Sequence, residues 1–99
     1  MDTRMLANKL LEKANNLMLQ RGKEYDKENG ERSMGKCVSA FNTITEHTLT
    51  ESEGWLLLQI LKDVRLFQKK GYHADSAEDC IAYAALKAEA KSMEKDNNQ

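Results

Sequence analysis

The spacing of apolar residues predicts that the 99-residue chain folds into four helices. It contains no proline, and β-branched residues are sparse outside residues 38–50, and both features favour helices. The first helix is expected over residues 3–20, ending where a glycine suits the backbone just past a helix, at Arg21-Gly22. Its apolar stripe comprises Leu6, Leu10, Ala14 and Leu17, widened by Met5, Leu11 and Met18.

A polar segment, residues 23–32, separates this helix from the next and contains the turn pair Asn29-Gly30. The second helix is expected to begin near Ser33, and residues 43–49 are expected to form a loop. The apolar face of this helix comprises Met34, Cys37, Val38, Phe41 and Ile44.

The third helix is expected over residues 51–69 and begins with a capping box, Thr50 with Glu53. It ends at Lys69-Lys70-Gly71, where cations oppose the helix dipole and a glycine stops the helix. Its apolar residues cover nearly every direction, which is typical of a buried helix. We therefore expect it to be the central helix, with Trp55, Leu58 and Leu61 inside.

The fourth helix is expected to start at Asp75 or Ser76 and to carry a face of mostly small residues: Cys80, Ala82, Tyr83, Ala85, Leu86 and Ala90. The short connection, about residues 70–74, makes the third and fourth helices antiparallel neighbours. The predicted fold is an all-α, compact antiparallel bundle of about four helices. It forms one domain over residues 1–91, followed by a polar, frayed tail over residues 92–99.

Composition narrows the class of protein. The formal net charge of −1 argues against a dedicated nucleic-acid surface, which is usually clearly basic. There is no signal-peptide pattern or apolar run of membrane-spanning length, so a cytoplasmic protein without a membrane partner is expected. Cys37 and Cys80 lack metal-binding spacing and are expected to be reduced and buried. Because the core of so short a chain is modest, we also expect a homo-oligomer.

Two pairs of charged residues are candidates for chemistry. Lys62 and Arg65 share a face of the third helix, and Asp75 and Asp79 lie one turn apart on the fourth, with Tyr83 a turn further. The structural interpretation is that the cations extend to solvent and the acids complement the helix dipole. The functional hypothesis is that the acids bind Mg²⁺ and the cations bind phosphate oxygens in one shared pocket.

Several segments resemble small bacteriophage and prophage proteins. They are Arg21-Gly22-Lys23-Glu24-Tyr25-Asp26, Glu31-Arg32-Ser33-Met34, Gly54-Trp55 to Lys62-Asp63-Val64-Arg65, and Asp75-Ser76-Ala77-Glu78-Asp79 to Tyr83-Ala84-Ala85-Leu86. Over residues 17–90 the chain looks like phage nucleotide-modification-associated domains. These are in turn similar to MazG-like all-α nucleoside triphosphate pyrophosphohydrolases.

The resemblance implies a nucleotide ligand, bound by Lys62, Arg65, Arg21, Lys23 and Tyr83. It also implies Mg²⁺ held by Asp75 and Asp79, and hydrolysis if the site is complete. MazG-like enzymes usually carry acids on both central helices, whereas this chain has Lys62 and Arg65 on the third. The alternative hypothesis is a phage accessory protein that inhibits a host protein by surface contact. Both hypotheses imply residence in the host bacterial cytoplasm.

Overall fold

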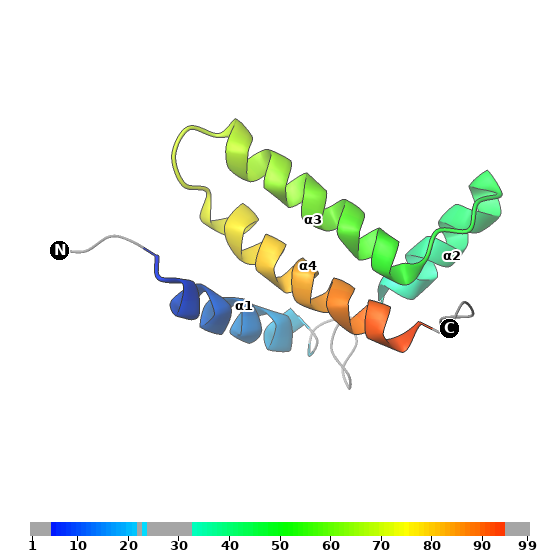
Figure 1. Cartoon of the computed structure of the whole chain (residues 1–99), viewed down its shortest axis with the longest axis horizontal. Helices are drawn as coiled ribbons and strands as arrows, with labels where there is room; N and C mark the ends of the chain where they lie inside the picture. Colours follow the sequence, from blue (N-terminus) through cyan, green and yellow to red (C-terminus); the bar gives the residue numbers. More distant parts are fainter. Residues whose placement is uncertain (1–4, 22, 24–32, 95–99) are drawn as a thin grey trace.

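A computed structural model describes residues 5–21, 23 and 33–94 of the chain (Figure 1). These residues form α1 (Ala7–Arg21), α2 (Ser33–Thr45), α3 (Glu51–Gln68) and α4 (Ala74–Met93). No residue in the described ranges is in a strand, so the all-α prediction is confirmed. None of the helices in these ranges has both the length and the apolar content that a membrane crossing requires.

The helices are layered in the order α3, α4, α1 (Figure 1). α3 and α4 form an antiparallel pair joined by a short connection, and α1 packs against the other side of α4. α2 packs against α3 near the start of that helix and projects away from the α3–α4 pair. The layering makes α4 the middle element.

The prediction that α3 is the central, most buried helix is therefore wrong. Seven residues of α4 are buried, namely Ser76, Ala77, Glu78, Asp79, Ala82, Leu86 and Ala90, against three of α3, Ser52, Gly54 and Trp55. Of the three α3 residues expected inside, Trp55 is buried and Leu58 packs partly buried against the core, whereas Leu61 is 40% exposed. The reason is geometric, because α4 is contacted by helices on two sides.

The core lies where α2, α3 and α4 meet. Its buried members are Met34, Val38, Trp55, Leu86 and Ala90, with Met18, Leu49, Leu58 and Tyr83 packed against them. Gly54 allows α2 to approach α3 closely. A Cβ there would lie 2.6 Å from Met34 Sδ and 2.8 Å from Val38 Cγ2, closer than side-chain atoms pack.

The apolar face predicted for the second helix is only partly buried. Met34 and Val38 lie in the core, whereas Cys37, Phe41 and Ile44 are exposed, because α2 extends away from the α3–α4 pair. The expectation that both cysteines are buried is thus wrong for Cys37, and Cys80 is partly exposed.

Several predicted helix boundaries differ from the structure. Among the described residues, α1 begins at Ala7 rather than Thr3. α2 continues to Thr45, where the Thr43 and Thr45 hydroxyls donate to carbonyls four residues earlier. The capping box at the start of α3 is confirmed, since Thr50 Oγ1 accepts from the Glu53 amide and Glu53 Oε1 accepts from the Thr50 amide.

The end of α4 is tied to the start of α3. α4 continues to Met93, so the first two residues of the expected frayed tail are helical. The Ser52 hydroxyl at the start of α3 donates to Glu94 Oε1, just past the end of α4, at 2.7 Å. Hydrogen bonding to Ser52 lowers the pKa of the Glu94 carboxyl. The rest of that tail, residues 95–99, and the charged segment at residues 24–32 lie outside the described residues.

Candidate functional site

Three charged side chains from three helices meet at Asp79. Lys62 Nζ of α3 lies 2.9 Å from Asp79 Oδ2, and Arg21 Nη2 of α1 lies 3.1 Å from Asp79 Oδ1. Asp79 is only 7% exposed, and each of its oxygens contacts one cation. We call Arg21, Lys62 and Asp79 the Asp79 cluster.

The local sequence explains how the Asp79 cluster forms. Lys62 lies two helical turns after the buried Trp55, on the side of α3 that faces α4. The short turn after α3 contains Gly71, whose φ of 84° suits a glycine, and it returns the chain so that the first turns of α4 lie beside the last turns of α3. Arg21 joins the cluster because α1 ends beside this part of α4.

A second ion pair lies beside the cluster. Lys13 Nζ of α1 is 3.1 Å from Glu78 Oε2, and Glu78 is buried at 6% exposure. The contact lacks hydrogen-bond geometry, and this oxygen accepts no hydrogen bond from the described residues. Consecutive acids of α4 therefore each attract a cation of α1, and Asp79 attracts one of α3 as well. Sequence reasoning missed Lys13, since spacing along α1 does not say which helix it faces.

A third polar contact joins α3 and α4. Cys80 Sγ donates to Asp63 Oδ1 at 2.9 Å. Burial, followed by the hydrogen bond to Asp63 and the charge of that carboxylate, raises the pKa of the Cys80 thiol to about 11. At neutral pH the thiol therefore keeps its proton and donates this hydrogen bond to Asp63.

The structure brings together only some of the predicted site residues. Lys62, Asp79 and Arg21 meet, whereas Arg65, Asp75 and Lys23 are exposed and make no ion pair with the described residues. Tyr83 stacks on Trp55 with ring centroids 5.6 Å apart, so its ring belongs to the core packing. Of the four residues predicted to share a pocket, only Lys62 and Asp79 contact each other. Arg21 of α1 contacts the same carboxylate.

Asp75 and Asp79 do not by themselves form a site suited to Mg²⁺. Asp75 is exposed, and both oxygens of Asp79 contact cations that a metal ion would have to displace. In the described part of the chain, no three His, Cys, Asp or Glu side chains come together as a set of metal ligands. Asp79 therefore offers a metal ion no oxygen that is not already in contact with a cation.

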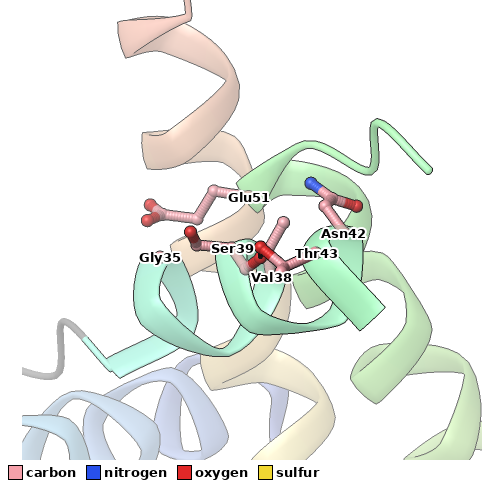
Figure 2. A pocket seen from close by; sticks show the side chains of 6 residues that line it. All are labelled: Gly35, Val38, Ser39, Asn42, Thr43 and Glu51. Carbon is pink, nitrogen blue, oxygen red and sulfur yellow. Dashed lines mark hydrogen bonds between the residues drawn. The ribbon is translucent and has the colours of Figure 1, made fainter. Parts of the chain in front are cut away.

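A shallow hollow of about 430 Å³ lies between α2 and the start of α3 (Figure 2). It is lined by Gly35, Val38, Ser39, Asn42, Thr43 and Glu51. The Asn42 side chain already donates to the Leu49 carbonyl and accepts from the Leu49 amide, both at 2.8 Å. None of the predicted site residues lines this hollow, and the Asn42 side chain is engaged by the turn between the two helices.

No family model, no curated protein and no solved structure matches the chain. The resemblance to phage nucleotide-modification-associated and MazG-like domains stays a prediction.

Proposed function

We propose that this protein binds a nucleotide through its phosphate groups at the Asp79 cluster. The observation that carries the proposal is the placement of Arg21 and Lys62, from two different helices, at one carboxylate. A carboxylate and a phosphate present similar anionic oxygens to arginine and lysine, so a group of cations that holds one is suited to the other.

Further cations extend the proposed site toward solvent. Lys23 is exposed two residues after Arg21, and Arg65 is exposed one turn after Lys62. Arg21 and Lys62 keep 34% and 17% of their side chains exposed, so a ligand reaches them without unfolding of the core. Phosphate oxygens would then compete with Asp79 for these two cations.

The family assignment is part of the same proposal. We infer a phage- or prophage-type protein related to the MazG-like enzymes that keeps nucleotide binding on a helical scaffold. Hydrolysis and the predicted Mg²⁺ ligands Asp75 and Asp79 remain hypotheses, because the cations at Asp79 compete with a metal there. Magnesium therefore enters the test as a variable.

A second candidate function is inhibition of a host protein by surface contact. The observation that favours it is the exposure of Phe41 and Ile44 on the projecting helix α2. Large exposed apolar residues are typical of protein-binding surfaces. A protein with this function needs no nucleotide, so the experiment below distinguishes the two.

The experiment is a thermal-shift screen of nucleoside mono-, di- and triphosphates, each with and without Mg²⁺. A ligand that binds only the folded state raises the Tm. The informative variant is Arg65→Gln, because Arg65 is exposed and makes no ion pair with the described residues, so its removal leaves the fold intact. Lys36→Gln, an exposed lysine on α2, is the matched control for loss of one positive charge.

The proposal predicts a Tm rise with at least one phosphate-bearing nucleotide, and a smaller rise in Arg65→Gln than in Lys36→Gln. A chain whose Tm responds to no nucleotide, with or without Mg²⁺, contradicts the proposal and favours the surface-contact function. Equal responses in both variants contradict the extension of the site to Arg65.

A further inference from the structure

One face of α3 is apolar and exposed over three helical turns. Its residues, here called the α3 stripe, are Leu57, Ile60, Leu61, Val64 and Phe67. Leu57 is 62% exposed and Phe67 is 83% exposed. The stripe is about 15 Å long, at a rise of 1.5 Å per residue. Such a contiguous apolar surface is typical of a binding face.

The α3 stripe lies on the opposite side of the helix from α4. At about 3.6 residues per turn, its centre falls half a turn from the side that carries Trp55 and Lys62. That second side packs against α4, where Lys62 reaches Asp79. In Figure 1, α3 is the outer helix of the layered pair, and α1 lies beyond α4. No described element covers the stripe.

The spacing within the stripe matches helix-to-helix packing. Leu57, Ile60, Val64 and Phe67 follow each other at three, four and three residues, which is the seam of a paired helix. Leu61 widens the seam, as in the core of a helical bundle. A partner that presents an apolar helix would therefore fit this face.

We propose that the partner is a second copy of this chain, with the two α3 helices packed antiparallel about a two-fold axis. In such a pair the same surface serves both copies, so an apolar stripe on one meets an apolar stripe on the other. The two α3–α4 layers then enclose a joint core. The proposal concerns the face opposite the Asp79 cluster and does not depend on nucleotide binding.

The charges along α3 favour this occupant and this orientation. Glu51 and Glu53 lie at the start of the helix, and Arg65 lies in its last turn, followed by Lys69 and Lys70 just beyond its end. An antiparallel pair brings the acidic start of one helix to the basic end of the other, whereas a parallel pair would bring like charges together. The helix dipoles have the same preference.

The stripe also suggests a register. With the two-fold axis at the level of residue 62, Leu57 of one copy lies level with Phe67 of the second copy, and Ile60 lies level with Val64. In the same register Glu53 comes beside the segment that contains Lys70. Lys62 itself points toward α4 and stays with Asp79, outside the shared interface.

The first test is the mass of the full chain in solution by light scattering at micromolar concentration. The expected result is twice the 11.3 kDa of one chain. Ile60→Glu, at the centre of the stripe, should weaken association roughly tenfold or more, since it buries a charge in the interface. Ile44→Glu is the matched control, because Ile44 is an exposed isoleucine on α2, outside the stripe.

Circular dichroism of each variant shows whether the helices persist, and Phe67→Ser provides a second disruption at the most exposed stripe position. Loss of the dimer in Ile60→Glu and Phe67→Ser but not in Ile44→Glu supports the proposal. A monomeric native chain overturns it and leaves a different protein as the occupant of the stripe. A dimer that survives both stripe variants also overturns it.

The orientation has its own test by disulfide cross-linking in a Cys37→Ser background. A mixture of the Leu57→Cys and Phe67→Cys chains should form a mixed covalent dimer under mild oxidation. Each chain alone should cross-link much less, because equal positions lie about 15 Å apart along the antiparallel pair. Efficient self-linking of the Leu57→Cys chain would indicate a parallel pair and overturn the orientation.

Discussion

Helices α3 and α4 show that apolar content does not decide which helix becomes the centre of this fold. α3 carries the larger apolar side chains, yet most of them reach the surface. α4 is rich in alanine and contains seven buried residues. The difference follows from the layering, since α4 is contacted by α3 on one side and by α1 on the other.

Small residues make that middle position available. Ala77, Ala82 and Ala90 are buried with little volume of their own, which allows neighbouring helices to approach α4 closely. Glu78 and Asp79 are buried with them, and they attract cations from both neighbouring helices. The outer helix α3 packs against α4 on one side only, and its other side exposes large apolar residues.

The largest expected effect compares one substitution on the two helices. Leu86→Ala removes a buried side chain of α4 and should lower the free energy of unfolding by roughly 2–5 kcal/mol. Leu57→Ala removes an exposed side chain of α3 and should cost less than about 1 kcal/mol. Urea unfolding measures both, in an Ile60→Glu background so that self-association does not contribute. Equal costs would contradict the middle position of α4.

A smaller effect is expected from the charges of α4. Asp79→Asn leaves Lys62 and Arg21 without their shared carboxylate and should cost about 1–3 kcal/mol. Asp75→Asn, at an exposed acid one turn earlier on the same helix, should cost less than about 1 kcal/mol.

The same urea measurement is repeated with Lys62→Met and with the double variant that combines Lys62→Met and Asp79→Asn. The four free energies of unfolding give the coupling energy between the two side chains. A coupling energy above about 0.5 kcal/mol between Lys62 and Asp79 is the expected result. If the two substitutions are simply additive, their 2.9 Å contact does not contribute to the stability of α4 against α3.

Local signals along the chain were enough for the helices. Periodic apolar residues, the capping box at Thr50 and the glycine at Gly71 predicted the four helices with errors of a few residues at their ends. These signals act within one or two turns, so they require no knowledge of the tertiary packing. α2 continues three residues further than expected, through Thr43 and Thr45, whose hydroxyls donate to carbonyls of the same helix and so satisfy their own polar groups there.

The packing needed information that spacing does not contain. The short connection between α3 and α4 predicted that Lys62 and Asp79 lie close together, and the structure confirms this contact. The contacts of Arg21 and Lys13 depend on α1 crossing α4, which no periodicity specifies. The apolar residues on all sides of α3 led to the wrong prediction that α3 is the central helix. An apolar residue that packs in the core and one that lies on an exposed face look the same in the sequence.

The last expected effect concerns the reactivity of the two cysteines, and it shows the same contrast between the middle helix and a projecting one. Cys80 of α4 donates to Asp63, and its pKa is raised to about 11. At pH 8 only about one Cys80 in a thousand is then a thiolate, whereas Cys37 on α2 is exposed. A thiol reagent should label Cys37 first, as read by mass spectrometry of tryptic peptides.

The raised pKa also fixes the sign of the pH dependence at Cys80. The folded chain holds the proton more tightly than the unfolded chain, whose thiol has an ordinary pKa of 9.0. The free energy of unfolding should therefore be constant below about pH 9 and fall as the pH rises toward about 11. Asp63→Asn removes a charge that raises this pKa, so it should speed the labelling of Cys80 and leave the labelling of Cys37 unchanged. Equal labelling rates for the two cysteines of the native chain at pH 8 would show that Cys80 is not held by α3 in the way its 2.9 Å contact with Asp63 implies.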